Sequence, residues 1–225
     1  MARRTSRRGV EHPAPPRPSA PDLPDTLERL EGVARGDDVE DAEVTGLSGV
    51  VEAGRTIFTA CRVPGIDADR MVLTDARLAD VVLDSPRITS LEGRGVRMRR
   101  VLVVGGRLGS CDLGEADLEG VEFRGVRIDY LGLARAALED LAFVDCRIGT
   151  LDLPGATVSR VALRDCRADE VGTDHLRAND LDLRGLDAGR WTSVAGLRGA
   201  TMTVDQVAGL LPDLARHVGI DLGAD

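Results

Sequence analysis

A period of five residues governs most of this chain. In steps of five from Ala53 to Ala188, 26 of 28 positions are apolar. The series two residues earlier, from Val51 to Leu186, is apolar at 25 of 28 positions. A helix repeats every 3.6 residues and a strand every two, so neither explains this spacing. The pattern predicts a chain that turns a corner every five residues, with two side chains of each group pointing inward.

A second period, of 20 residues, is built from the first. Large apolar residues recur at positions 58, 78, 98, 118, 138 and 158, and small or medium ones at 76, 96, 116, 136 and 156. Segments 121–140 and 141–160 align residue for residue without a gap. Four corners therefore close one coil. Successive coils stack large residues on large ones and small on small, as a filled interior requires.

The repeat resembles that of the pentapeptide repeat family, whose consensus is A(D/N)LXX. The best matches are Ala116-Asp117-Leu118 and Cys111-Asp112-Leu113, followed by Leu151-Asp152-Leu153 and Leu181-Asp182-Leu183. The resemblance covers about residues 46–195. It implies an all-β solenoid, a right-handed quadrilateral parallel β-helix, and the 28 repeats predict about seven coils with short capping helices at both ends.

Four segments follow from this pattern. Residues 1–22 are rich in Arg and Pro and predict a disordered basic tail. Residues 23–45 predict an N-terminal helix, over 25–35 with Asp25 as its N-cap, and an acidic linker. Residues 46–195 form the solenoid. Residues 196–225 predict a C-terminal helical cap.

Both ends of a stacked solenoid are open sheet edges that need covering. We expect the helix at 25–35 to cover one end, and a helix or helix pair over 203–219, with Thr203 as N-cap, to cover the other. Trp191 lies where the inward series ends and is expected to plug the last coil. An apolar face on the C-terminal helices either caps its own rod or joins a second copy, as the resemblance implies. Its residues are Val207, Leu210, Leu211 and Leu214.

Composition narrows the cellular setting. Aromatic residues make up 2% of the chain, so the core must be built from Leu, Val, Ile and Ala. All basic residues are Arg, which favours a GC-rich bacterial genome. No apolar run is long enough for a membrane span. The arginines at 3, 4, 7 and 8 lack the apolar stretch of an export signal, so we expect a cytoplasmic protein.

Nothing in the sequence forms a catalytic constellation. The three His residues are scattered, and no Gly-rich phosphate loop precedes a helix. The four Cys residues fall in the inward series, where Cys acts as a small hydrophobe, and they lack zinc-ligand spacing. We therefore predict no catalytic residue, no cofactor and no metal site, and we expect that the chain is not an enzyme.

One outward column carries only arginine. Five residues spaced by 20 stack on one face: Arg87, Arg107, Arg127, Arg147 and Arg167. Five like charges at strand spacing repel one another unless carboxylates or an anionic partner balance them. Two interpretations remain open. The column is either a solvated ladder balanced by nearby acids, among them Asp145 and Asp165, or a docking stripe for an acidic partner.

Charge distribution separates two functional hypotheses. The formal net charge is −9, of which residues 21–50 carry −7 and residues 51–190 only −4. This acidity disfavours direct binding to nucleic acid or anionic membranes. The preferred hypothesis is a non-enzymatic scaffold or protein-interaction module with an unknown protein partner. The resemblance implies an alternative, a DNA-mimicking modulator or inhibitor of a type II topoisomerase such as DNA gyrase, similar to quinolone-resistance proteins. The nearly neutral rod weakens it, because a DNA mimic needs a densely acidic face.

Overall fold

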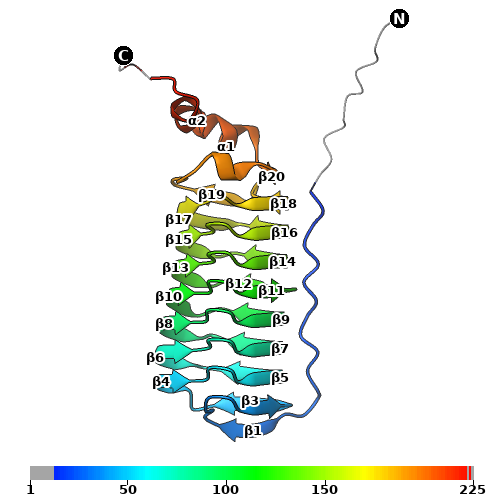
Figure 1. Cartoon of the computed structure of the whole chain (residues 1–225). Helices are drawn as coiled ribbons and strands as arrows, with labels where there is room; N and C mark the ends of the chain where they lie inside the picture. The colour runs from blue at the N-terminus through cyan, green and yellow to red at the C-terminus, as the bar shows by residue number, and fades with distance from the viewer. Residues whose placement is uncertain (1–12, 222, 224–225) are drawn as a thin grey trace, which may run out of the picture.

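The chain forms a straight rod of stacked coils with two short helices at one end (Figure 1). The structure, a computed structural model, describes residues 13–221 and 223. Within these residues the strands form two parallel sheets that face each other across the core. The predicted parallel β-solenoid is confirmed, with about eight turns rather than seven.

Sheet A has twelve strands within the described residues. They are β1 (Glu28–Glu31), β2 (Asp38–Glu40), β3 (Ala42–Thr45), β5 (Ile57–Pro64), β7 (Arg77–Asp84), β9 (Arg97–Val104), β11 (Asp117–Glu119), β12 (Glu122–Arg124), β14 (Ala137–Val144), β16 (Thr157–Arg164), β18 (Arg177–Asp182) and β20 (Ala200–Thr201). Sheet B has eight, namely β4 (Ser48–Glu52), β6 (Asp67–Val72), β8 (Arg87–Glu92), β10 (Arg107–Asp112), β13 (Arg127–Gly132), β15 (Arg147–Asp152), β17 (Cys166–Gly172) and β19 (Leu186–Ala188).

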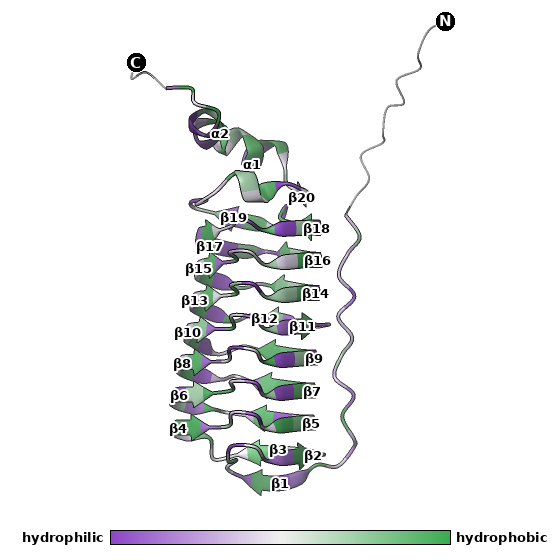
Figure 2. Ribbon diagram, viewed as in Figure 1, coloured by the Kyte–Doolittle hydropathy of each residue, from purple (hydrophilic) through white to green (hydrophobic). Residues whose placement is uncertain are grey.

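Register between coils is 20 residues along most of the rod. Leu118, for example, lies between Met98 and Leu138 in sheet A. Apolar and polar residues alternate along the strands (Figure 2), so that each sheet presents one face to the core and one to the surface. The backbone of each coil is hydrogen-bonded to the coils above and below it, which leaves only the ends of the rod unsatisfied.

Corners of the coils use the left-handed backbone conformation. In one coil Asp75, Asp80 and Ser85, spaced by five residues, have φ values of 57°, 57° and 53°. Fifteen non-glycine residues in the described part of the chain have positive φ, and seven of them are Asp. Asp enters this region at lower cost than most residues. The corners therefore favour short polar residues whose side chains point outward.

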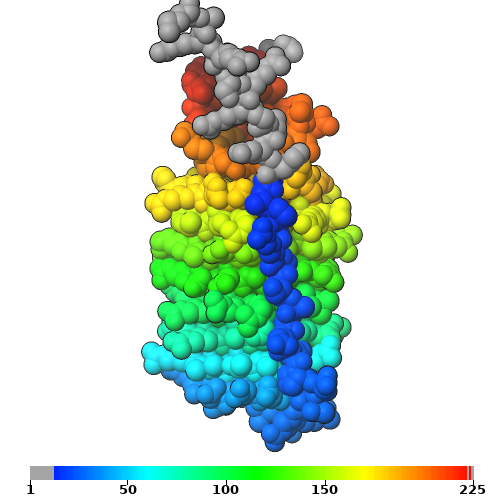
Figure 3. Space-filling model, turned by 90° about the vertical axis from the view of Figure 1, so that its right-hand side faces the viewer, coloured from blue at the N-terminus to red at the C-terminus, as the bar shows by residue number. Residues whose placement is uncertain are grey.

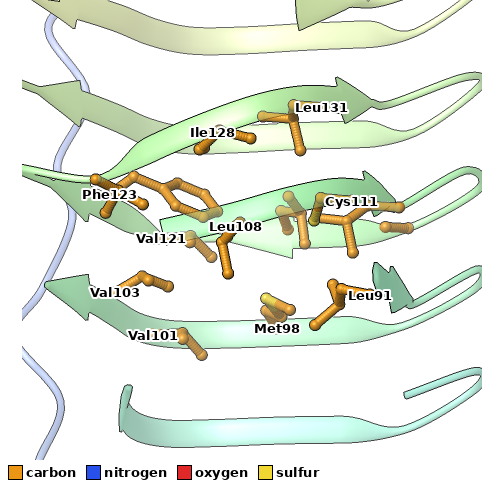
Figure 4. Packing of buried hydrophobic residues seen from close by; sticks show 14 of the residues in the cluster. Leu91, Met98, Val101, Val103, Leu108, Cys111, Val121, Phe123, Ile128 and Leu131 are labelled. Carbon is orange, nitrogen blue, oxygen red and sulfur yellow. The ribbon is translucent and has the colours of Figure 1, made fainter. Parts of the chain in front are cut away.

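The core is a single apolar stack between the sheets. Figure 4 shows Leu108, Phe123 and Ile128 among the side chains that point into it. Phe123 and Phe143 are neighbours in register on β12 and β14, and their rings stack with centroids 5.0 Å apart and planes 9° apart. Large residues thus lie on large ones, as the 20-residue period predicts.

The N-terminal end differs from the prediction of a helix over 25–35, which is wrong. Residues 28–31 form β1, which pairs in parallel with β3 and extends sheet A. The first coils follow a register of 19 residues, in which Val39 lies beside Phe58. The register becomes 20 at an irregularity between Gly49 and Val50. That one-residue shift hides the first coil from a strict count by fives and accounts for the additional turn.

The segment of residues 13–24, which we call the strap, does not form the free tail that the sequence predicts. It runs in extended form back along the outside of sheet A, from the first coil toward the last (Figure 3). Three of its backbone N–H groups donate hydrogen bonds, each of 3.0 Å, to carboxylates of the rod. Asp22 donates to Asp80, Arg17 to Asp140 and Ala14 to Asp180. The rest of the predicted tail, residues 1–12, lies outside the described residues.

Acid should weaken this docking. Ion pairs with Arg partners and the strap N–H groups hold the pKa values of Asp80 and Asp140 below their usual range. A depressed folded-state pKa contributes stability above about pH 4, the pKa of an unfolded Asp, and loses it as pH falls through the folded-state value. We expect the amide proton resonances of Arg17 and Asp22 to lose their hydrogen-bonded shifts as pH falls below 4 in an NMR titration.

The amide of Ala20, which donates no hydrogen bond within the described residues, serves as the internal control. The charged groups that face the two carboxylates are Arg100, Arg99 and the Asp22 carboxylate at Asp80, and Arg160 and Arg17 at Asp140. Arg160 is also paired with Glu139. Strap amide shifts that stay constant down to pH 2.5 in a folded protein would contradict this expectation.

The C-terminal end is covered by η1 (Ala195–Leu197), α1 (Val204–Gly209) and α2 (Leu211–His217). Thr203 is the N-cap of α1, as predicted, and forms a capping box with Gln206. The Gln206 side chain also donates hydrogen bonds of 2.7 Å to the carbonyl oxygens of Leu183 and Leu186, at the edge of the last coils. Trp191 pairs with Val171 and packs against the end of the core.

Candidate functional site

The arginine column forms one continuous stripe on the outside of sheet B. We call Arg87, Arg107, Arg127, Arg147 and Arg167 the arginine ladder; all five side chains are exposed. Each lies at or next to the first residue of its strand, on β8, β10, β13, β15 and β17. The five are direct neighbours in register. The spacing read from the sequence is therefore realised as a row one strand layer apart, about 4.8 Å.

An acidic residue ends the row on each side. Asp67 lies in register below Arg87, and Asp187 lies in register above Arg167. The stripe thus begins and ends with a carboxylate. The positive charge is concentrated on the middle coils.

Counter-charges within the ladder come from the column two residues farther along each strand. Asp129 bridges two steps, with its carboxylate oxygens 2.7 Å from Nη2 of Arg107 and 3.3 Å from Nε of Arg127. These contacts, first that of Arg107, hold the pKa of Asp129 below its usual range. Arg167 lies 3.7 Å from Asp169 and 3.8 Å from Asp187. Exposed pairs of this kind contribute at most about 1 kcal/mol each.

The expected partners Asp145 and Asp165 are not the ones that the structure uses. Both lie beside the ladder, but neither forms an ion pair with it. Among the described residues Arg87 and Arg147 have no ion-pair partner. The ladder is therefore only partly balanced, which leaves both interpretations of it open and favours neither by charge count alone.

The surface beside the ladder is hollowed where the counter-charge column holds glycine. Two open depressions, of about 470 and 760 Å³, follow this column, and Gly109 and Gly149 lie on their floors. A Cβ atom at either glycine would lie 2.3 Å from the carbonyl oxygen of the preceding coil. Side chains are thus excluded there. The result is a row of arginines beside a shallow, largely backbone-lined furrow.

The predicted apolar face on the C-terminal helices is divided by the fold. Leu210 is buried and Leu214 is partly buried, so these two cover the end of the rod. Val207 and Leu211 remain 42% and 60% exposed. Leu210 therefore belongs to the end cap. The pairing of the exposed residues with a second copy stays a prediction.

The thiols have no reactive character in this fold. Cys61, Cys111, Cys146 and Cys166 are all free and buried in the core. Burial raises the pKa of Cys111 to about 12, and burial raises that of Cys61 as well. A hydrogen bond with Cys166 and burial raise the pKa of Cys146. Protonated, enclosed thiols pack as small hydrophobes and are poor nucleophiles.

Two further observations concern residues 13–221 and 223. No group of three or more His, Cys, Asp or Glu side chains there is arranged to hold a metal ion. No helix in that part of the chain is long and apolar enough to cross a membrane.

Sequence reasoning missed a second functional surface, the contact between the strap and the corner carboxylates. The column at 80, 140 and 180 was visible in the sequence as three Asp residues spaced by multiples of 20. Nothing local, however, marked residues 13–24 as the segment that they hold. Comparison with models of protein families finds no match to this chain, and neither does comparison with curated proteins.

Proposed function

We propose that the chain is a non-enzymatic binding module of the pentapeptide-repeat type, which docks an acidic protein partner along the arginine ladder. The observation that carries this proposal is the row of five exposed arginines in register, of which Arg87 and Arg147 have no ion-pair partner among the described residues. A rigid rod positions these groups with little conformational cost. Four free, buried thiols are in keeping with a reducing compartment, so a cytoplasmic location is part of the proposal.

The chemistry of the ladder favours carboxylates as ligands. Guanidinium groups present planar forks that bind carboxylates through two parallel hydrogen bonds. Neighbouring forks stand about 4.8 Å apart, which suits acidic side chains on an extended segment or on the edge of another sheet. The furrow over Gly109 and Gly149 leaves room for the backbone of such a segment. Because the Debye length is about 8 Å at physiological ionic strength, the distant acidic segment 21–50 is largely screened from the ladder.

Neutralising the middle of the ladder should weaken binding of an acidic probe. We expect the triple variant R107Q/R127Q/R147Q to bind a fluorescent, extended glutamate-rich peptide at least tenfold more weakly than the unaltered chain. Each rim charge contributes up to about 1 kcal/mol, and 1.4 kcal/mol is a factor of ten. Fluorescence anisotropy at several salt concentrations measures the effect.

A matched triple variant controls for net charge. R99Q/R124Q/R164Q removes the same three charges from exposed positions on sheet A, outside the ladder. It should change the affinity less than threefold. Equal losses in the two variants, or no saturable binding to the unaltered chain, would overturn the proposal. A DNA gyrase supercoiling assay addresses the alternative function, and inhibition that survives R107Q/R127Q/R147Q would favour it.

A further inference from the structure

The strap is held by its backbone rather than by its side chains. The three hydrogen bonds that anchor it run from main-chain N–H groups to carboxylate oxygens of the rod. All three acceptors, Asp80, Asp140 and Asp180, belong to one corner column, in which each residue has positive φ. Their donors are separated by three and five residues along the strap. We call this corner column, with the surface that the strap covers, the strap groove.

The spacing of the acceptors matches an extended proline-rich chain. Asp140 and Asp180 are two coils apart, about 10 Å, and Asp80 and Asp140 are three coils apart, about 14 Å. A polyproline II chain rises 3.1 Å per residue, so three residues span about 9 Å and five span about 15 Å. Three residues of such a chain therefore correspond to two coils of the rod. The strap also contains six prolines, none of which occupies a donor position; they are Pro13, Pro15, Pro16, Pro18, Pro21 and Pro24.

The floor of the strap groove is apolar although it lies on the outside of the rod. Val82, Ala142 and Ala162 occupy outward positions of β7, β14 and β16, yet they are only 9%, 2% and 2% exposed. Arg62, in the same column of β5, is exposed. Pro16 of the strap is itself buried. Figure 3 shows the strap lying along this side of the rod, where it removes the outward apolar residues from water.

The rod positions the acceptor carboxylates without help from the strap. Nε of Arg100 lies 2.6 Å from Asp80, and Nε of Arg160 lies 2.8 Å from Asp140, each from the next coil. The amide of Asn179 donates a hydrogen bond of 3.0 Å to Asp180. These partners fix the orientation of the acceptors. The groove is therefore a built site whose geometry belongs to the solenoid.

We propose that the strap groove is a binding site for extended, proline-rich peptides that carry free N–H groups at positions i, i+3 and i+8. Residues 13–24 are the ligand that the chain itself carries. The site recognises backbone spacing and the absence of bulk, since its contacts are main-chain hydrogen bonds and an apolar floor. It lies on sheet A and is independent of the arginine ladder on sheet B.

The test uses the full chain with a specific protease site inserted between the exposed residues Pro24 and Asp25. After cleavage, a labelled synthetic peptide of residues 13–24 is titrated against the rod by fluorescence anisotropy. We expect saturable binding, with displacement of the cleaved segment. A peptide N-methylated at Arg17, which lacks the N–H that reaches Asp140, should bind at least tenfold more weakly. A peptide N-methylated at Ala20, whose N–H makes no such bond, is the matched control and should bind like the parent.

A pair of variants tests the groove from the side of the rod. Asp140→Asn should weaken the parent peptide severalfold, whereas Asp145→Asn, at a corner with nearly the same φ but away from the strap, should not. No saturable binding up to about 1 mM, a dissociation constant that corresponds to only about 4 kcal/mol, would overturn the proposal. Equal binding of the two N-methylated peptides would do the same, because the spacing of N–H groups would then be irrelevant.

Discussion

Replacing Phe143 by alanine should lower the free energy of unfolding by about 3–5 kcal/mol, the range for a buried phenylalanine. Phe143 is only 2% exposed and stacks on Phe123 of the preceding coil. The chain contains only three phenylalanines, so few large side chains are available to collapse into the space that is left. Because each coil contacts only its neighbours, a cavity in the middle of the rod weakens the coupling between its two halves.

Denaturant unfolding followed by far-UV circular dichroism measures this loss. Phe143→Leu keeps most of the volume and should cost less than about 1.5 kcal/mol. Tyr130→Ala, at a side chain that is 39% exposed, serves as a surface control and should cost less than Phe143→Ala. If Phe143→Ala were no more destabilising than Phe143→Leu, the stacked core described above would be incorrect at this coil.

The second large effect is expected at Gly106. Its φ is +78°, and a Cβ atom there would lie 2.1 Å from the carbonyl oxygen of Pro86 and 2.6 Å from its nitrogen. Backbone atoms of the neighbouring coil cannot move aside without breaking the stack. We expect Gly106→Ala to destabilise the fold by about 2–4 kcal/mol, the sum of a left-handed backbone cost and of overpacking.

The adjacent glycine provides the control. Gly105 also has positive φ, +64°, but a Cβ atom there would meet only Ser85, with its Oγ 3.4 Å away. Ser85 and Asp145 occupy the same corner column with positive φ and a side chain. Gly105→Ala should therefore cost only about 1 kcal/mol. Thermal unfolding of both variants distinguishes the two positions, and equal melting temperatures would show that the contact with Pro86 is not limiting.

The inward columns were predictable because each repeat encodes its own geometry. Leu118, Leu138 and Val158 point inward for the same local reason, a corner every five residues, and stacking follows from the 20-residue sum. The N-terminal segment was not predictable in this way. Leu27, Leu30 and Val33 have helical spacing, but residues 28–31 pair with β3 instead. Pairing with an open sheet edge outweighs a weak helical preference.

The candidate site was predictable in part. The arginine ladder follows directly from the period, since a 20-residue register must place Arg107 beside Arg127. Its counter-charges did not follow. Asp145 precedes Arg147 by two residues and seemed suitable by sequence distance, whereas Asp129 is used because it lies between two steps of the ladder. Which carboxylate meets a guanidinium depends on side-chain direction across the turn, and the repeat pattern does not specify that.

The sequence by itself determined the solenoid, its inward columns and the position of the ladder, because these features repeat locally and reinforce one another from coil to coil. Only the tertiary structure decided the course of the strap. Its three anchors join residues 58, 123 and 166 positions apart, and no periodicity links a proline-rich segment to distant corner carboxylates. The physical reason is that the strap matches the rod in length: the rise of an extended proline-rich chain agrees with the coil spacing, and that agreement exists only once the coils are stacked.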